Sequence, residues 1–162
     1  MKTAIIYASK YGTTEKVALS IADKLKITNE VELVSLKTNP NPNINEFETV
    51  ILGTPIYAGQ TSKKMKAFCK ANEFVLLQKK TGLFVCGMHH DKEQREKELK
   101  DAYSETLQQN AIATGFMGGA FLFEKMNFVE RTIIKKIAKT TTSVHQIDED
   151  AIDKFVEKMK NT

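Results

Sequence analysis

The chain has 162 residues, enough for one domain with a substantial hydrophobic core but short for two. Its formal charge of +4 is mild, and RNP-type aromatic motifs and zinc-finger spacings are absent, so nucleic acid is not an expected partner. The sequence lacks both the roughly 18–20 apolar residues of a membrane-spanning helix and the long apolar segment of a secretory signal. These features predict a single cytoplasmic domain over residues 1–162.

The two cysteines, Cys69 and Cys86, lie in apolar surroundings without a C-x-x-C motif or the spacing of metal ligands. Free cysteine in such a context behaves as a small buried hydrophobe. His145 has no second histidine at ligand spacing and is interpreted as a surface residue. The sequence therefore predicts two reduced thiols in a reducing compartment and no metal site.

Five short runs are predicted as strands, and the first of them is uniformly apolar, which is typical of a parallel strand that is buried on both faces. In chain order they cover residues 3–8, 31–36, 49–53, 82–87 and 113–123. The last run has a break at Gly118-Gly119. Polar turns are expected after the third strand, at 54–60, and in the proline-containing stretch 37–45.

Five amphipathic helices are predicted where apolar residues recur at helical spacing. Their apolar faces fall within residues 17–25, 65–69, 99–107, 129–137 and 152–159. The first helix has Thr13 or Thr14 as a candidate cap, and the second has Thr61 or Ser62. Acidic residues at 148–150 open the last helix, as the helix dipole favours.

This alternation of strands and helices predicts a doubly wound α/β sandwich of three layers around a sheet of five parallel strands. Such sheets bind ligands beyond the carboxyl ends of their strands, where the direction of winding reverses. Candidate functional residues are therefore expected in the loops after the first, third and fourth predicted strands.

The loop after the first strand has the composition of a phosphate site. Where a strand turns into a helix, unpaired backbone N–H groups and the positive end of the helix dipole favour an anion. The loop adds the hydroxyls of Ser9, Thr13 and Thr14, and Gly12 allows close approach of the backbone. The dinucleotide fingerprint and the P-loop are absent, so a terminal phosphate suits the loop better than a pyrophosphate. An ordinary helix cap is the alternative role for these hydroxyls.

Residues 5–18, IIYASKYGTTEKVA, resemble the phosphate-binding signature of the flavodoxin family, in which an apolar strand precedes [ST]-x-x-G-x-T and a helix. Residues 53–59, GTPIYAG, resemble the second flavin loop of that family. Within it the chain is most similar to the flavodoxin-like, menaquinone-dependent protoporphyrinogen dehydrogenases, through the opening MKT and the Gly119-Ala120 strand before a basic segment. The resemblance implies a flavodoxin-like fold that binds FMN and transfers electrons through it.

The resemblance assigns three segments of this chain to FMN. The implied residues are Ser9, Lys10, Tyr11, Gly12, Thr13 and Thr14 around the phosphate, Thr54, Pro55, Ile56, Tyr57 and Gly59 on one side of the ring, and Cys86, Gly87, Met88 and His89 on the other. Tyr57 is the better stacking candidate, with a half-exposed loop aromatic as the alternative. His89 is a candidate proton donor or an exposed loop residue.

The sequence departs from typical flavodoxins in three respects. It has no tryptophan, it has Met88-His89-His90 where a tyrosine often stacks, and it carries Lys10 in a loop that is usually neutral. Flavodoxins are commonly acidic, which penalises the anionic reduced flavin. A chain of charge +4 is therefore expected to hold a less reducing flavin, suited to a quinone.

The segment from Asn127 to Lys139 combines apolar residues at helical spacing with one arginine and three lysines. A basic amphipathic helix can lie on an anionic membrane or bind an acidic partner. A crossover helix that covers the sheet is the preferred interpretation, and peripheral contact with the inner face of the membrane is left open.

Two functions fit these observations. The first is an oxidoreductase that passes electrons from a reduced substrate, such as a porphyrinogen, through FMN to a quinone. The second is a non-enzymatic electron carrier that meets redox partner proteins. Neither requires an acid–base pair of the protein, because the flavin performs the redox chemistry. A receiver-type signalling domain is excluded, because Ser9-Lys10 and Gly53-Thr54 stand where that class needs acidic residues.

Overall fold

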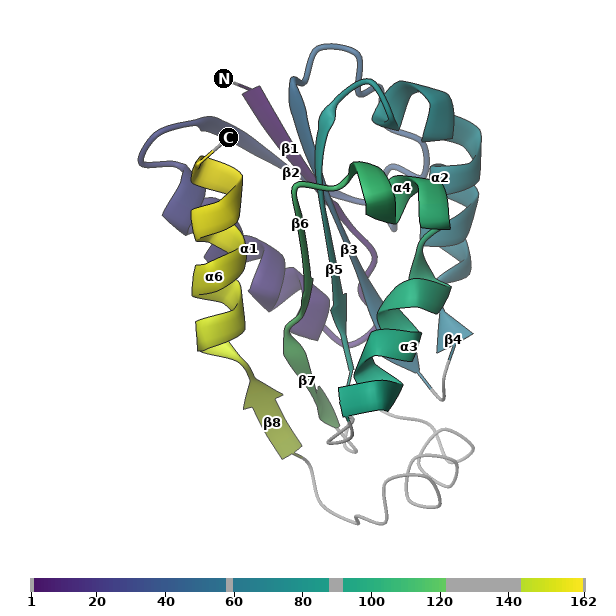
Figure 1. The fold of residues 1–162 in the computed structure, drawn as a ribbon, viewed down its shortest axis with the longest axis vertical. Coiled ribbons are helices and arrows are strands. Elements are labelled where there is room, and N and C mark those ends of the chain that lie inside the picture. The colour runs from purple at the N-terminus through teal and green to yellow at the C-terminus, as the bar shows by residue number, and fades with distance from the viewer. Residues whose placement is uncertain (1, 58–59, 88–91, 122–143, 162) are drawn as a thin grey trace.

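The computed structural model describes residues 2–57, 60–87, 92–121 and 144–161 (Figure 1). Its main sheet has parallel strands in the order β2-β1-β3-β5-β6, and a short strand, β4 (Gln60–Thr61), pairs antiparallel with the end of β3. The parallel strands are β1 (Lys2–Tyr7), β2 (Glu30–Ser35), β3 (Thr49–Tyr57), β5 (Lys80–Cys86) and β6 (Ala113–Phe116). This order confirms the predicted doubly wound, flavodoxin-like sandwich with five parallel strands.

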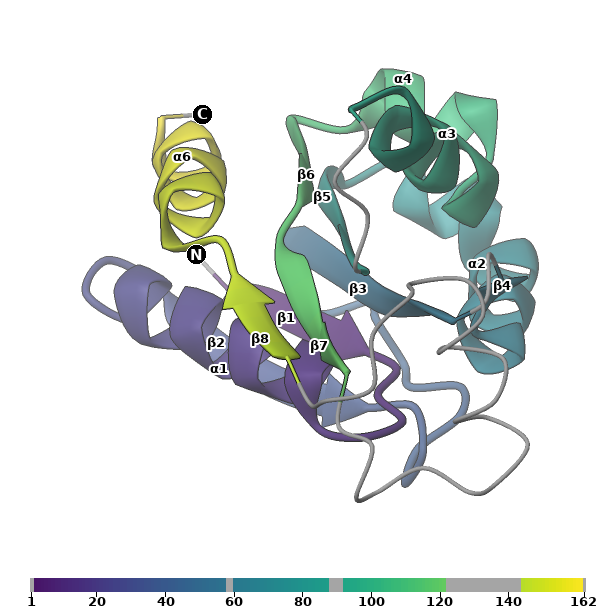
Figure 2. The same cartoon turned by 90° about the horizontal axis from the view of Figure 1, so that it is seen from below.

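Helices cover both faces of the sheet. Helices α1 (Thr13–Leu25) and α6 (Glu149–Lys160) lie on one face, and α2 (Lys63–Leu76), α3 (Lys92–Ala102) and α4 (Glu105–Asn110) lie on the other. Figure 2 shows the sheet between these two layers. None of the described helices combines the length and the apolar character needed to cross a membrane.

Successive side chains along a strand point to opposite faces of the sheet, so each strand contributes residues to two hydrophobic cores. On β1, Ala4 and Ile6 pack in the core beneath α2 and α4, whereas Ile5 and Tyr7 pack beneath α1 and α6. All four are buried, which explains why the strand is apolar at successive positions rather than at alternate ones.

Both cysteines are free and buried, as predicted. Cys69 lies in the core beneath α2, and burial raises the pKa of its thiol to about 12, with Glu73 adding to the rise. Two predicted helix starts are also confirmed. Ser62 Oγ accepts from Met65 N–H at 3.4 Å at the start of α2, and Asp148 caps α6.

The predicted turn at 54–60 is wrong over its first residues, because β3 continues to Tyr57. Thr54 and Pro55 remain in register with Val85 and Cys86 of β5. Pairing with a neighbouring strand thus overrides the local turn preference of the Thr-Pro pair.

The single helix predicted over 99–107 is two helices. Ser104 interrupts it, since its hydroxyl accepts from Leu107 N–H at 3.2 Å and starts α4 as a new helix. The predicted strand 113–123 is divided as well. β6 stays in the main sheet, whereas β7 (Gly118–Phe121) pairs with β8 (Val144–Ile147), which the sequence did not predict. The helix predicted around 129–137 lies outside the described residues.

Candidate functional site

The carboxyl ends of β1, β3 and β5 lie side by side at one edge of the sheet. Tyr7 is in register with Gly53, and Pro55 is in register with Cys86. The direction of winding reverses between β1 and β3, which is where doubly wound sheets bind ligands. The fold therefore brings the three segments assigned from the sequence to one place.

The loop after β1 is held by its own backbone and by one side chain. Ala8 N–H donates to Gly53 O at 3.0 Å, so the chain stays against β3 after the strand ends. Gly12 N–H donates to Ser9 Oγ at 3.0 Å. Gly12 itself has φ +95°, a left-handed conformation that residues with a side chain adopt only at a cost.

Helix α1 begins without a side-chain cap, and Gly12 is its N-cap residue. The predicted capping role of Thr13 or Thr14 is therefore wrong, and both residues lie in the first turn. Thr14 is 1% exposed, and its Oγ1 makes no hydrogen bond with the described residues. An unsatisfied buried hydroxyl costs free energy, and this one lies at a helix start that favours an anion.

Lys10 and Tyr11 contact each other within the same loop, with Lys10 Nζ 5.5 Å from the centre of the Tyr11 ring. Glu15 follows in the first turn of α1. Burial raises the pKa of Tyr7, and the neighbouring Glu15 carboxylate adds to that rise. The positive charge of Lys10 is thus offset by the negative charge of the nearby Glu15. The groups that suit the loop to an anion are therefore its backbone N–H groups and hydroxyls.

The second segment belongs to β3 rather than to a loop. Thr54 is fully buried, and its hydroxyl donates a hydrogen bond to the backbone oxygen of Pro55 at 3.4 Å. Ile56 is half-buried and packs against the core beneath α2. Tyr57 ends the strand, but its side chain lies outside the described residues, as does Gly59. The predicted stacking of Tyr57 on the ring stays a prediction.

The third segment begins in the core. Cys86 is 3% exposed, and burial raises the pKa of its thiol to about 12. The Thr14 hydroxyl lies near enough to oppose this rise, although the pair does not reach hydrogen-bond geometry. Gly87 follows at the end of β5, while Met88 and His89 lie outside the described residues. Cys86 therefore lies in the core beneath α1, near Thr14 in the first turn of that helix.

The sequence did not predict that β7 passes directly over the end of β5. Gly87 N–H donates to Gly118 O at 2.8 Å, and a Cβ at Gly119 would lie 3.1–3.2 Å from the Gly87 backbone. Glu98 of α3 also reaches this point, and it is 4% exposed with Oε2 3.3 Å from where a Gly87 Cβ would be. The adjacent glycines were the available signal for the close backbone approach.

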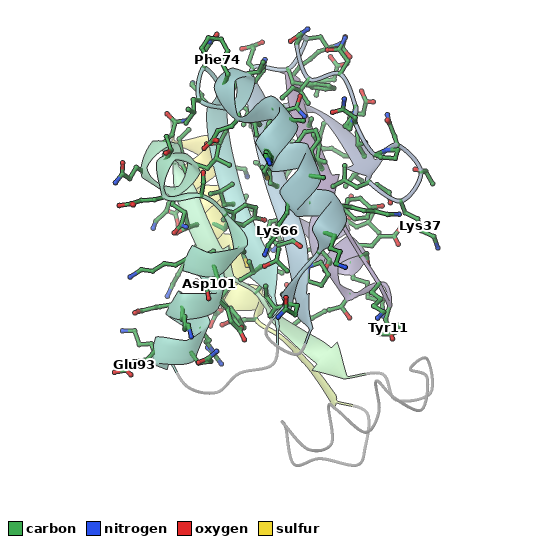
Figure 3. All side chains as sticks on the ribbon, turned by 90° about the vertical axis from the view of Figure 1, so that its right-hand side faces the viewer. Tyr11, Lys37, Lys66, Phe74, Glu93 and Asp101 are labelled. Atoms are coloured by element: carbon green, nitrogen blue, oxygen red, sulfur yellow. The ribbon has the colours of Figure 1, made fainter. Side chains whose placement is uncertain are left out.

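A pocket of about 450 Å³ opens between the loop after β1 and the start of α2. Its described lining includes Ser9, Pro55 and the four lysines Lys10, Lys37, Lys63 and Lys64. In the view of Figure 3, the labelled Lys37 and Tyr11 both lie to the right of α2. Sequence reasoning found Ser9, Lys10 and Pro55 but missed the other three lysines, because they are far apart along the chain and only the fold brings them together.

The flavodoxin domain model matches residues 4–148 of this chain. The chain belongs to the flavodoxin family. A curated flavodoxin of Clostridium saccharobutylicum is 35% identical over 79 residues, which are 47% of this chain and 49% of that protein. The matched part thus spans about half the length of that relative.

Solved structures show the same fold. Oxidised flavodoxin 1 from Bacillus cereus matches with a TM-score of 0.62 and 21% identity, over 100% of this chain and 99% of that one. A Fusobacterium nucleatum flavodoxin, solved bound to flavin mononucleotide, matches with a TM-score of 0.54 and 17% identity, over 99% and 97% of the two chains.

Family membership confirms the expectation of FMN as the cofactor. The residues present fit a single phosphate. The Thr14 hydroxyl is buried without a hydrogen bond to the described residues, and the uncapped start of α1 offers N–H groups that have no partner within the helix. Ser9 Oγ accepts from Gly12 and still has its own hydrogen to donate.

Proposed function

We propose that this chain binds FMN non-covalently at the carboxyl edge of its sheet and carries electrons through it to redox partner proteins. One observation carries the proposal: the buried Thr14 hydroxyl makes no hydrogen bond with the described residues and lies at the uncapped start of α1. A phosphate there satisfies the hydroxyl and the first-turn N–H groups together. Membership of the flavodoxin family supports the same conclusion.

The residues of the chain bind and orient the cofactor in this proposal. Ser9, Thr13, Thr14 and the backbone of the loop donate to the phosphate, with Gly12 setting the turn. The segments at the ends of β3 and β5 flank the ring and exclude water from its faces. When bound, FMN supplies the one- and two-electron redox chemistry.

Reconstitution with flavin tests the proposal. The purified protein is expected to be yellow, with absorbance bands near ~375 and ~450 nm. After removal of the flavin, the apoprotein is expected to take up one equivalent of FMN. The decrease in flavin fluorescence on binding measures this uptake. Colourless protein that takes up no FMN at micromolar concentration would contradict it.

The reduction potential of the bound FMN is expected to be less negative than in an acidic flavodoxin. The chain has a net charge of +4, and Lys10 lies in the proposed phosphate loop. Positive charge near the flavin favours its anionic reduced form. Spectroelectrochemical titration measures the reduction potential of the bound FMN directly. A potential as low as that of an acidic flavodoxin would contradict this expectation.

The same charge favours a second candidate function, an oxidoreductase that resembles the menaquinone-dependent protoporphyrinogen dehydrogenases. In this case a reduced substrate of the porphyrinogen class gives electrons to FMN, and a quinone receives them. An assay of menadione reduction coupled to protoporphyrinogen oxidation distinguishes the two functions. Turnover by the purified protein alone supports the enzyme, and its absence supports the carrier.

The segment from Asn127 to Lys139 lies outside the described residues, and its contact with a membrane is a separate proposal. The support is its sequence, a basic amphipathic pattern suited to an anionic surface. Flotation with anionic and with neutral liposomes tests whether an otherwise cytoplasmic protein associates with the inner face of the membrane. Flotation with anionic but not with neutral liposomes would support membrane contact, and no flotation with either would support a crossover helix that covers the sheet.

A further inference from the structure

The pocket beside the proposed phosphate loop is lined by several lysine side chains, and the proposed flavin site does not require all of them. Lys10, Lys37, Lys63 and Lys64 line it, and its described lining contains no aspartate or glutamate. These lysines come from three separate segments, which follow β1, follow β2 and start α2. We call this set of four lysines and the space between them the basic hollow.

Three of these lysines are available to a partner. Lys37, Lys63 and Lys64 are exposed, and their ammonium groups form no ion pair or hydrogen bond with the part of the chain that the structure describes. Two half-exposed lysines elsewhere do have acidic partners: Lys24 contacts Asp153, and Lys2 lies 3.4 Å from Glu46. What distinguishes Lys37, Lys63 and Lys64 from other exposed lysines is that they surround one pocket.

Lys63 and Lys64 also stand at an unfavourable place for their helix. They are the first two residues of α2, where the dipole favours negative charge, and this turn has no acidic residue. By contrast, α1 and α6 carry Glu15 and Glu149 in their first turns. Helix stability therefore does not explain these two lysines, whereas attraction of an external anion does.

We propose that the basic hollow is the docking surface for an acidic redox partner protein. The inference rests on the proposed electron-carrier function. Ser9 and Pro55 line both the hollow and the proposed flavin site, so a partner seated on these lysines lies beside the cofactor. Complementary charge there would speed the encounter and fix the orientation of the two proteins.

The shape favours a protein over a membrane. The hollow, of about 450 Å³, is a recess between the loop after β1 and the start of α2. Flexible glutamate and aspartate side chains can reach into such a space from a protein surface. A bilayer presents a broad, flat layer of headgroups, which suits lysines on a protruding helix better than lysines around a recess.

Binding of a fluorescein-labelled peptide of ten glutamates to the FMN-loaded full chain tests the proposal by fluorescence anisotropy. The variant K37E/K63E/K64E leaves Lys10 intact because that residue belongs to the phosphate loop. It is expected to fold, since glutamate suits the first turn of α2. The matched control K80E/K154E/K160E changes net charge equally at exposed lysines away from the hollow.

We expect the peptide to bind the wild-type protein, and higher salt to weaken binding. The K37E/K63E/K64E variant should lose about tenfold or more in affinity, as expected for three exposed ion pairs, while the control stays within about twofold. Equal losses in both variants, or no loss in either, would overturn the proposal. So would binding of phosphatidylglycerol vesicles through these lysines without binding of the peptide.

The flavin spectrum separates this inference from the proposed function. If K37E/K63E/K64E retains one FMN and is reduced by dithionite like the wild type, a failed peptide experiment removes only the docking surface. If the wild-type protein takes up no FMN, the proposed function fails first. The rate at which hexacyanoferrate(III), an anionic oxidant, reoxidises the reduced protein is expected to fall in K37E/K63E/K64E and not in the control.

Discussion

The Ser9 hydroxyl accepts a hydrogen bond from the backbone N–H of Gly12 at 3.0 Å, and this bond closes the turn that joins β1 to α1. It leaves the remaining first-turn N–H groups of α1 directed away from any intrahelical partner. The turn depends on the left-handed backbone of Gly12. The Ser9 hydroxyl and the left-handed backbone of Gly12 therefore define the shape of this turn together.

Replacement of Gly12 by alanine tests the conformational requirement alone. A Cβ at this position would have no heavy atom within 4 Å, so steric clash plays no part. We expect Gly12→Ala to lower the free energy of unfolding of the apoprotein by about 1–2 kcal/mol, the usual cost of left-handed backbone for a residue with a side chain. Urea denaturation measures it. Gly12→Asn is the control and should lose less, because asparagine tolerates this conformation; equal losses would point to another cause.

Gly53 makes room for the Phe84 ring of the neighbouring strand. A Cβ on Gly53 would lie 2.0–2.5 Å from three atoms of that ring, which is fully buried. We expect Gly53→Ala to lower the free energy of unfolding by about 3 kcal/mol or more, since neither strand can move freely. In the double variant Gly53→Ala/Phe84→Leu, part of this loss should return. If thermal or urea unfolding shows simple additivity of the two changes, the steric explanation is wrong.

The two buried thiols predict a loss of stability at alkaline pH. The pKa of each is raised from 9.0 to about 12 by burial. Below pH 9 both thiols are protonated in the folded and unfolded states, and their contribution is complete. As the pH rises from about 9 to 12, the unfolded chain loses these protons first, so stability should fall by about 1.4 kcal/mol per pH unit for each thiol.

Urea denaturation between about pH 8 and 10.5 checks this expectation. The variants Cys69→Ala and Cys86→Ala should each flatten the alkaline decline relative to the wild type, whatever their effect at neutral pH. Tyr103, whose pKa is also raised well above 10.0 by burial, leaves a residual decline in both. Parallel pH profiles for the wild type and both variants would be inconsistent with the raised thiol pKa values.

The order of strands and helices was predictable because the buried parallel strands at the centre of the sheet contain several consecutive apolar residues. β1 and β5 show this plainly. The predictions failed where contacts between distant segments decide the outcome. β3 extends through Pro55 because β5 pairs with it, and β7 leaves the main sheet to pair with β8. No local pattern encodes either pairing.

The part of the candidate site that is contiguous in the sequence was predictable, and the part that depends on the fold was not. The proposed phosphate loop is contiguous in the sequence, so the sequence alone could nominate Ser9, Gly12 and Thr14 as one candidate set. The start of α1 was misassigned because a threonine near a helix start usually caps it, whereas here Gly12 takes that position. The lysines at 37, 63 and 64 come together only through the order of the strands.

The most direct measurement compares FMN and riboflavin binding by Thr14→Val and Thr81→Val. Both hydroxyls are buried without a hydrogen bond to the described residues, but Thr81 lies at the opposite, amino end of its strand. Thr14→Val should weaken FMN binding by about 10- to 100-fold, the value of a hydrogen bond to a charged group, and leave riboflavin binding nearly unchanged. Thr81→Val should change neither. If Thr14→Val binds FMN as the wild type does, or loses FMN and riboflavin affinity equally, this hydroxyl does not bind the phosphate.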